Sequence, residues 1–381
     1  MNSLREVLSE LKDVASNPRT KLDEYLNQGK KVIGCMPYFC PEELVHAAGM
    51  TPFGLWGAET QISEAKRYLP AFICSIVQTT LELGIRGGYR GLSAVMAPIL
   101  CDSLKSMDGN WRRGVKDIPI IPVAHAQNRK TKAGIEFTAS QYRKITTRLE
   151  EISGKRVTDA DIAESISIYN IRNAAVRRLI DESAIRPGLI EASERSAVFK
   201  SGYFMEVSEY TSKVRALCEL LAGLSIGSAS PEVGTGPSVI TCGIIADNTG
   251  LLSILDECGV FIADDVVTHE SLRFRCDTPG GGDPYTSLAR VISDIEGCPV
   301  LFDPGKKRIE MLIDVVRRRA AGGVIFVMTK FCDPEEYDIV PLRRALQENG
   351  IKSLTVDVDQ QTTDIEQIRT AIETFSEILR G

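Results

Sequence analysis

The spacing of apolar residues along the chain changes character twice and so separates three stretches. From Lys31 to about Lys130, helical segments alternate with short β-rich runs at residues 31–35, 92–100 and 118–125. From about Gly134 to Ala229 the spacing is that of helices. A linker rich in Gly, Ser and Pro follows at 225–237. Alternation then returns, with β-rich runs at 238–245, 259–265, 298–303, 323–331 and 353–359.

Strands separated by helices of this length predict parallel sheets with crossover helices. We therefore expect an α/β protein with two doubly wound parallel-sheet domains, of the Rossmann or flavodoxin-like kind, and a helical insert. A chain of 381 residues is long enough for two such cores. The expected units are an N-terminal α/β domain at 1–133, a helical segment at 134–230 and a C-terminal α/β domain at 231–381.

Composition and charge narrow the possible partners. The chain is 43% hydrophobic and 25% charged, with a formal net charge of −6. It has no polybasic stretch, which argues against binding to nucleic acid or to an anionic membrane. No apolar run reaches the roughly 18 residues that span a bilayer. The N-terminus has the pattern of an amphipathic helix rather than of a signal peptide, so the cytoplasm is the expected compartment.

Ten cysteines in a reducing compartment favour metal binding or redox chemistry over a disulfide framework. In open parallel sheets, ligands gather at the carboxyl ends of the strands. Cys101 and Cys332 both follow predicted strands and begin predicted helices. Cys74 lies in the first turns of a helix that we expect to begin near Pro70. Amide dipoles at that helix end favour the thiolate form, which metal binding requires.

Three thiolates at one cleft between domains would form the ligand set of an iron–sulfur cluster, whose fourth iron would keep an open position. Spacing alone leaves open the alternative of three unconnected cysteines. Cys35 and Cys40 also follow a strand, and for them both ligation and packing remain possible. The other five are expected to be core or surface thiols, namely Cys218, Cys242, Cys258, Cys276 and Cys298.

Other residue types give weaker indications. The three histidines form no H-E-x-x-H pattern and no G-x-S-x-G occurs, which argues against zinc-dependent and serine hydrolysis. His125 follows a predicted strand and could face the same cleft, although a structural hydrogen bond is the simpler expectation. Two P-E-E triplets contain Glu42, Glu43, Glu335 and Glu336. Favourable charge at a helix N-terminus explains these carboxylates more simply than acid–base catalysis does.

A glycine-rich loop at 277–284 is the one conspicuous flexible segment. Its glycines would allow a phosphate to approach the backbone, but no G-x-G-x-x-G or G-K-[ST] accompanies them. We therefore expect a loop without a ligand, and no ATP site on this chain.

Several segments together resemble the β subunits of 2-hydroxyacyl-CoA dehydratases. They are GCMPYFCPEELVHAAGMTPFGLWG, YLPAFICSIVQ, PILCDSLK, AHAQNRKTKAG, IADD followed by RFRCD, and KFCDPEEYD. The family includes enzymes that act on lactoyl-CoA, 2-hydroxyglutaryl-CoA and 2-hydroxyisocaproyl-CoA, with benzoyl-CoA reductase subunits as more distant relatives. The similarity runs from the first helix to the last, and several motifs over that length are far more specific than any one.

The resemblance implies that three cysteines hold a [4Fe–4S] cluster between the two α/β domains. The family's ligand positions fall on Cys74 and Cys101 in the N-terminal domain and on Cys332 in the C-terminal domain. Two departures are small: Ala126 stands where the family often has Pro, and Thr329 where it often has Met. Neither removes a ligand, so both concern local packing.

By the same resemblance, the chain is the β subunit of an oxygen-sensitive, heterodimeric hydro-lyase. The acyl-CoA substrate would bind mainly to the α subunit, and an ATP-dependent iron–sulfur activator would supply an electron that this subunit relays. One electron added to the (R)-2-hydroxyacyl thioester gives a ketyl radical, which expels the hydroxyl group. The radical also acidifies a β-hydrogen that no side-chain base could otherwise remove. The product is the (E)-2-enoyl-CoA, and the electron is recycled.

Two alternatives differ from this expectation in ways that can be tested. A homodimeric relative with a double-cubane iron–sulfur cluster would need more than three cluster cysteines per chain, and Cys35 with Cys40 could supply them. A non-catalytic electron-transfer or ligand-binding protein with two α/β lobes would show no turnover with any partner.

Overall fold

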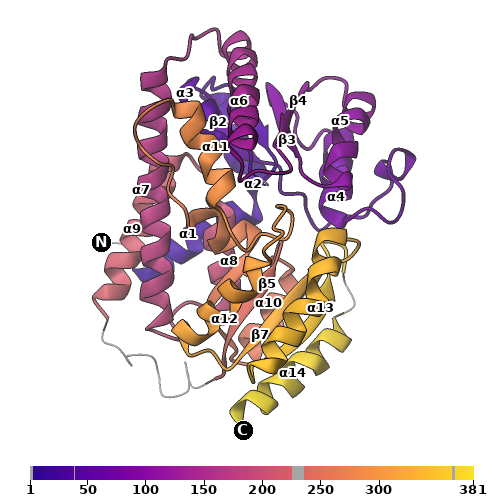
Figure 1. Ribbon diagram of the computed structural model, residues 1–381, viewed down its shortest axis with the longest axis vertical. Coiled ribbons are helices and arrows are strands. Elements are labelled where there is room, and N and C mark those ends of the chain that lie inside the picture. Colours follow the sequence, from indigo (N-terminus) through magenta and orange to yellow (C-terminus); the bar gives the residue numbers. More distant parts are fainter. Residues whose placement is uncertain (1–2, 38, 225–235, 363–364) are drawn as a thin grey trace.

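The computed structural model describes residues 3–37, 39–224, 236–362 and 365–381. Two four-stranded sheets lie one above the other in Figure 1, and every strand pair in them is parallel. The predicted α/β class with two parallel sheets and a helical insert is therefore confirmed. The strands are β1 Val32–Cys35, β2 Thr51–Gly54, β3 Ala94–Ile99, β4 Ile120–Ala124, β5 Ser238–Gly243, β6 Phe261–Val267, β7 Gly323–Thr329 and β8 Lys352–Val358.

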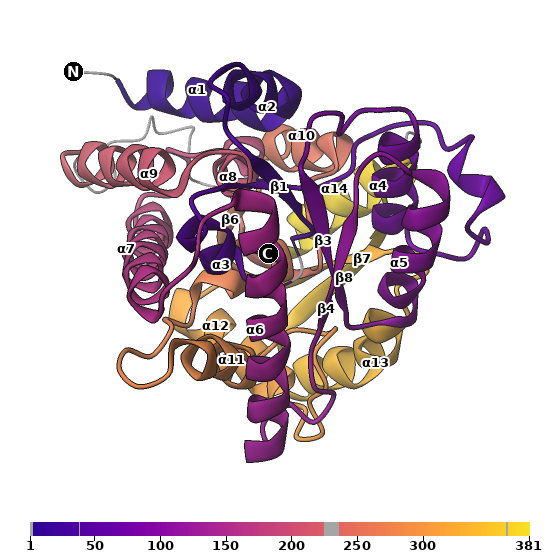
Figure 2. The ribbon, with the colours of Figure 1, turned by 90° about the horizontal axis from the view of Figure 1, so that it is seen from above.

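The N-terminal sheet has the strand order β2-β1-β3-β4. Its edge strand β2 was not expected from the sequence, because Pro52 and Gly54 are typical of a loop. Proline is tolerated on an edge strand, and Pro52 is aligned with Ile33 of β1 in the parallel register. Figure 2 shows α4 and α5 on one side of this sheet and α6 on the other. The helices that connect its strands are α3 Glu42–Ala47, α4 Ser75–Ile85 and α5 Asp102–Gly114, with a short turn η1 at Ala65–Arg67.

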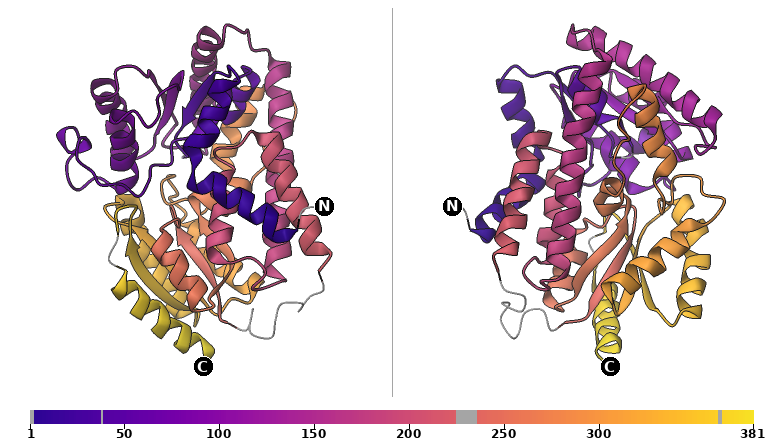
Figure 3. Two further views of the ribbon diagram at one scale, coloured as in Figure 1. Left: turned by 180° about the vertical axis from the view of Figure 1, so that it is seen from behind. Right: turned by 60° about the vertical axis from the view of Figure 1, so that its left-hand side comes forward.

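Six helices form a layer beside the sheets. They are α1 Leu4–Ser16, α2 Pro18–Asn27, α6 Lys132–Ser153, α7 Asp159–Ala184, α8 Ala192–Ser201 and α9 Val207–Ala222. Helices α7 and α9 lie side by side, as Figure 3 shows, and α1 packs on α8 and α9. Because α7 contacts both α3 and β6, this layer joins the two sheets.

The C-terminal sheet has the order β6-β5-β7-β8. Residues 298–303, predicted as a strand, form turns instead. Their apolar side chains Cys298, Val300 and Leu301 are buried all the same, and a short apolar run alone does not distinguish a buried turn from a strand. The helices of this part are α10 Thr249–Glu257, η2 Thr268–Leu272, α11 Pro284–Asp294, α12 Lys307–Arg319, α13 Asp333–Glu348 and α14 Glu366–Arg380.

One hydrophobic core runs through both sheets rather than stopping at a boundary. Its buried members include Ile33 and Val95 from the N-terminal sheet and Ile240 and Leu312 from the C-terminal part. Helix α11, late in the sequence, crosses over to pack on α6. Relative motion of the two sheets would therefore disturb a shared core.

Two sequence-based expectations concern segments outside these elements. The linker expected at 225–237 falls almost wholly on residues 225–235, which lie outside the described residues. In the part of the chain that the structure describes, no helix is long and apolar enough to cross a membrane.

Candidate functional site

Three cysteines each occupy the residue immediately before a helix. Cys74 precedes α4, Cys101 precedes α5 and Cys332 precedes α13. For Cys74 the predicted helix start near Pro70 is wrong. The backbone N–H of Ile73 donates to the carbonyl oxygen of Pro70 at 3.4 Å, so the proline opens a turn and the helix begins only at Ser75.

The sulfur atoms of these three cysteines lie close enough to influence one another. Burial raises the pKa of the Cys332 thiol well above its ordinary value, and charge on Glu335, Cys74 and Cys101 adds to the shift. Burial also raises the pKa of Cys74 to about 11, with a contribution from Cys101. Figure 1 shows α4 and α13 meeting end to end where the two sheets adjoin. The structure thus gathers two thiols from the N-terminal half and one from the C-terminal half.

Burial controls the protonation of these thiols more strongly than the helix ends do. Cys74 and Cys332 are 8% and 7% exposed, whereas Cys101 is partly exposed. Backbone amides in the first turn of each helix lower the thiol pKa, although none forms a full capping hydrogen bond. Because burial outweighs them, the pKa of all three thiols is raised, contrary to the expected preference for thiolate. A bound metal would have to displace the protons.

The donor atoms of the three cysteines bear on which group they could hold. Among the described residues, no group of three or more His, Cys, Asp or Glu side chains is placed to hold a single metal ion. Three thiols with no oxygen or nitrogen ligand among them form a soft donor set, which suits iron–sulfur chemistry.

Cys35 and Cys40 occupy another environment. Both are buried, at the end of β1 and just after it, and their charges interact with each other. Cys40 lines a small cavity of about 60 Å³ together with Tyr142, Arg172 and Arg273. This cavity contains none of the three helix-start cysteines.

His125 is also buried. Its Nε2 lies 3.1 Å from the Tyr142 hydroxyl oxygen, and burial lowers the pKa of the imidazole to about 4. The ring is therefore neutral at physiological pH and is hydrogen-bonded within the protein.

The two P-E-E triplets lie in the first turns of α3 and α13, as expected for favourable charge at a helix N-terminus, but one carboxylate of each triplet is also buried and faces arginine. Glu42 is buried between Arg172 and Arg273, with Oε2 3.4 and 2.6 Å from their guanidinium nitrogens. Glu335 is 1% exposed whereas its neighbour Glu336 is exposed. Sequence reasoning treated Glu335 and Glu336 alike and so missed that only one faces inward. The signal was positional: Glu335 is three residues after Cys332, on the same side of the first helical turn.

The remaining predicted features have structural explanations. All ten cysteines are free, and Cys218, Cys242 and Cys298 are buried. The glycine-rich loop leads into α11: Gly281 and Gly282 adopt positive φ, and the side chain of Asp283 caps the helix by accepting from the Thr286 N–H.

Comparison with known proteins decides the family. The model of the 2-hydroxyglutaryl-CoA dehydratase D-component family matches residues 37–379. The chain belongs to this dehydratase family. It is 43% identical over 380 residues to the (R)-phenyllactyl-CoA dehydratase beta subunit of Clostridium sporogenes. It is 38% identical over 382 residues to the lactoyl-CoA dehydratase subunit beta of Anaerotignum propionicum. Both comparisons cover 100% of this chain and 100% of the relative. A subunit of the benzoyl-CoA reductase of Thauera aromatica is 24% identical over 92% of this chain and 91% of its own length. The resemblance inferred from the motifs is confirmed.

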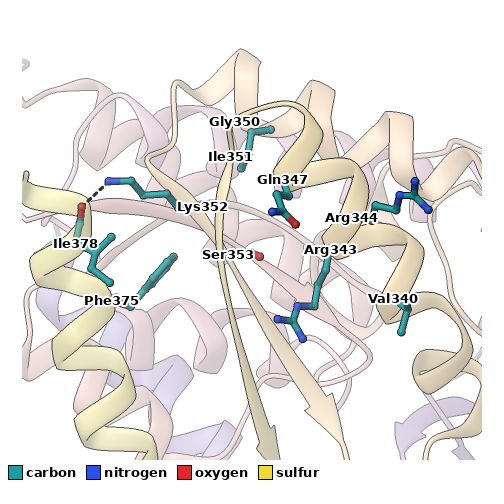
Figure 4. A pocket seen from close by; sticks show the side chains of 10 residues that line it. All are labelled: Val340, Arg343, Arg344, Gln347, Gly350, Ile351, Lys352, Ser353, Phe375 and Ile378. Atoms are coloured by element: carbon teal, nitrogen blue, oxygen red, sulfur yellow. Dashed lines mark hydrogen bonds between the residues drawn. The ribbon is translucent and has the colours of Figure 1, made fainter.

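The dehydratase chain also has a surface hollow that lies apart from the cysteines. About 660 Å³ in volume, it lies between α13, β8 and α14, and Figure 4 shows its basic side chains Arg343, Arg344 and Lys352. The Lys352 amine donates to the Ile378 carbonyl oxygen at 2.6 Å. Among the described residues that line this hollow, none is a cysteine, a histidine or a carboxylate. The helix-start cysteines are therefore the stronger candidate for chemistry.

Proposed function

We propose that this chain is the β subunit of an (R)-2-hydroxyacyl-CoA dehydratase and that Cys74, Cys101 and Cys332 hold a [4Fe–4S] cluster. The observation that carries the proposal is the meeting of three helix-start cysteines, drawn from both halves of the chain, in a member of the dehydratase family. Family membership makes the chain a component of a hydro-lyase, and the three thiols supply a soft donor set for the cluster.

The residues around the cysteines suit a buried, electron-carrying group. A cluster bound here would supply one-electron transfer at low potential. Each thiol gives up its Sγ proton on ligation, and the first-turn amides of the three helices then face a thiolate, which they stabilise. The near-complete burial of Cys74 and Cys332 keeps water from two of the ligands.

The overall reaction would remove water from a 2-hydroxyacyl thioester to give the (E)-2-enoyl thioester. It involves no net oxidation or reduction, because the electron that enters the substrate returns after the hydroxyl group and the β-hydrogen have left. In our proposal this chain passes the electron from an ATP-dependent iron–sulfur activator to a substrate site on the α subunit. The relatives named beta subunits support the existence of such a partner.

Exposed apolar side chains near the cysteines support contact with another protein. Phe72 is 71% exposed two residues before Cys74, and Phe331 is 49% exposed directly before Cys332. Tyr337 and Val340 add exposed apolar area on the first half of α13. Large apolar side chains that cluster on a surface mark interaction sites.

A reconstitution matrix tests the proposed function. The chain is purified anaerobically and mixed with the α subunit, the activator, ATP and a reductant, with each component omitted in turn. Formation of 2-enoyl-CoA should require every component, and the isolated chain should bind iron and sulfide but dehydrate nothing. Turnover without the α subunit would contradict the β-subunit role and favour a homodimeric enzyme. No turnover in any mixture would favour a binding protein.

Exposure to air is a second test of the same proposal. A low-potential cluster with one iron free of thiolate should be lost by oxidation, so brief air exposure should bleach the visible absorbance and inactivate the complex. An air-stable and fully active preparation would contradict the electron-relay role.

A further inference from the structure

The turn that carries Cys332 has an unusual backbone. It joins the last residue of β7, Thr329, to the first turn of α13. Phe331 adopts a φ of 62°, in the left-handed region that residues other than glycine rarely enter. The Cys332 N–H donates to the Thr329 carbonyl oxygen at 3.1 Å, which closes the turn. Such a conformation persists only where the surroundings hold it.

The side chain of Glu335 supplies that constraint. Its Oε2 accepts a hydrogen bond from the Thr329 N–H at 3.3 Å, and its own N–H donates to the Cys332 carbonyl oxygen at 3.0 Å. The side chain of Glu335 therefore binds Thr329 at the start of the turn, and its backbone N–H binds Cys332 at the end of the turn. The side chains of Thr329, Cys332 and Glu335 are all buried.

Arg308 of α12 fixes the carboxylate in turn. Its Nη2 lies 3.6 Å from Glu335 Oε1 and donates to Cys242 Sγ at 3.3 Å, while its Nη1 lies 3.7 Å from an Asp338 oxygen. The arginine is 5% exposed. A buried guanidinium between two carboxylates and a thiol connects α12, β5 and α13 around the Cys332 turn.

The corresponding turn in the N-terminal half has no such device. Cys101 follows β3 and precedes α5 with the same Cys-Asp pair, yet the position that corresponds to Glu335 is the buried apolar Leu104. Leu100, which corresponds to Phe331, does not adopt a positive φ. A cysteine can therefore precede a helix without a carboxylate three residues later. Of these two turns, only the strained one has such a carboxylate.

We propose that Glu335, held by Arg308, is a positioning residue for Cys332. It keeps the strained turn closed, so that the Cys332 sulfur points toward Cys74 and Cys101. The inference rests on the proposed function, because it takes Cys332 to be a cluster ligand. Without the carboxylate, the Thr329 N–H loses its acceptor and Arg308 loses a partner, and Phe331 can relax to negative φ. Cys332 then becomes the weakest of the three ligands.

The test compares Glu335→Ala with two matched controls in the same helix. Glu336→Ala removes the neighbouring exposed carboxylate, and Leu346→Ala removes a buried side chain at the far end of α13. Iron per chain, the rate of iron release to a chelator and the electron paramagnetic resonance spectrum of the reduced protein are measured anaerobically. Glu335→Ala should bind iron about 10- to 100-fold more weakly, the loss typical when a residue that supports a metal ligand is removed, and should release it correspondingly faster. Its spectrum should change.

The controls separate positioning from general stability. Leu346→Ala should lower the thermal midpoint yet keep the wild-type release rate and spectrum. Glu336→Ala should leave the midpoint, the release rate and the spectrum unchanged. Glu335→Gln should rescue much of the retention, because its amide oxygen can still accept from Thr329. Glu335→Asp keeps the charge but is too short to reach, so it should release iron as Glu335→Ala does. These last two variants carry the test if Glu335→Ala does not fold.

The outcomes distinguish this inference from the proposed function. If Cys332→Ser retains full iron, the cluster assignment fails whatever Glu335 does. If Cys332→Ser loses iron but the Glu335 variants match Glu336→Ala in release rate and spectrum, the positioning role alone is overturned. Equal release from Leu346→Ala and Glu335→Ala would likewise overturn it, because general destabilisation would then be the cause.

Discussion

The two sheets of this protein have the same strand order but are held together differently. Counted along the chain, each sheet runs second, first, third, fourth strand, and in each a cysteine follows the third strand and begins a helix. In the N-terminal half the residue three positions after the cysteine is the buried, apolar Leu104. In the C-terminal half it is the buried Glu335, which pairs with Arg308. The shared strand order thus places a cysteine at the same point of both sheets, although different residues surround it.

The second strands show the same contrast. β2 presents Pro52 and Phe53, whereas β6 carries Asp264 and Asp265, which are 1% and 0% exposed. Asp264 is paired with Arg319 of α12, whose Nε lies 2.9 Å away, and with Arg275, whose Nη2 lies 2.9 Å away. The C-terminal half therefore depends on buried ion pairs, which are strongly sensitive to loss of one partner.

The halves also differ in how the helix before the third strand begins. In the N-terminal half, Cys74 occupies the position before α4. In the C-terminal half, Lys306 occupies the position before α12 and adopts a φ of 50°. A third thiol thus comes from one half alone, so the proposed ligand set has two members from the N-terminal half and one from the C-terminal half.

The largest expected effect comes from replacing the two cysteines that follow the third strand of each sheet. Cys101→Ser and Cys332→Ser should each lose most of the bound iron and abolish dehydration, because the proposed cluster would lose one of its three thiolates. Cys218→Ser and Cys298→Ser, which change buried thiols elsewhere, are the controls. Iron and sulfide per chain are counted after anaerobic purification. Full iron content in Cys101→Ser would contradict the assignment.

The next effect concerns the ion pairs of the C-terminal half. The Arg195 guanidinium binds Glu270 at 2.6 Å and also Asp265, and all three side chains are buried. Arg195→Met should lower the free energy of unfolding by about 3–5 kcal/mol, because two buried carboxylates lose the cation that they share. Urea unfolding measures this change in the free energy of unfolding. Arg5→Met, which removes an exposed pair with Glu194, should lower that free energy by at most about 1 kcal/mol. Equal decreases in the two variants would show that burial of the ion pair does not matter.

In the N-terminal half, a buried carboxylate is satisfied mainly by backbone. Glu82 accepts from the N–H groups of Ala65 and Ser63 at 2.8 and 3.1 Å. Burial acts to raise the pKa of Glu82, but these hydrogen bonds outweigh it and the pKa is lowered. Glu82→Gln should cost about 2 kcal/mol at neutral pH, as expected for hydrogen bonds to a charged group.

The sign of its pH dependence follows from that shift. A lowered pKa means that the stabilisation is complete above the ordinary value of 4.5 and is lost as the pH falls through the folded-state pKa. The difference between wild type and Glu82→Gln should therefore shrink on acidification. Chemical unfolding across the acid range measures it. A difference that stays constant with pH would show that the ionised carboxylate is not responsible.

The smallest effect distinguishes the two cysteine-bearing turns by their backbones. Phe331→Gly should change stability by less than about 1 kcal/mol, because relief of the left-handed conformation, about 1–2 kcal/mol, offsets the added freedom of glycine in the unfolded chain. Leu100→Gly has no such relief and should destabilise more. Thermal unfolding measures the stability of both variants. An equal loss of stability in the two would contradict strain at Phe331.

The sequence carried enough information to predict most of the strands and the helix-start cysteines, because apolar runs and Cys-Asp pairs are local patterns. It could not reveal the shared strand order of the two sheets, which is a property of topology and leaves no repeat in the residues. β2 was missed because Pro52 is compatible with a strand only at an edge. The segment 298–303 was misassigned because burial of a turn and of a strand needs the same apolar residues.

The burial of Glu335 was beyond prediction for a related reason. Charge at a helix start is equally favourable for Glu335 and Glu336, and only the packing of α12 determines which of them is buried. The ligand role of Cys74, Cys101 and Cys332 stays a prediction, supported by their convergence. Long-range packing, not local pattern, decides such points.

The division of the three thiols between the halves also sets an order in time. Cys332 lies near the end of the chain, whereas Cys74 and Cys101 lie in its first third. Until synthesis has passed residue 332, a growing chain offers only two of the three thiols, and α6 lacks its cover from α11 until residues 284–294 have been made. Any group that needs all three sulfurs can therefore be bound only after the C-terminal half has been made and has joined the N-terminal half.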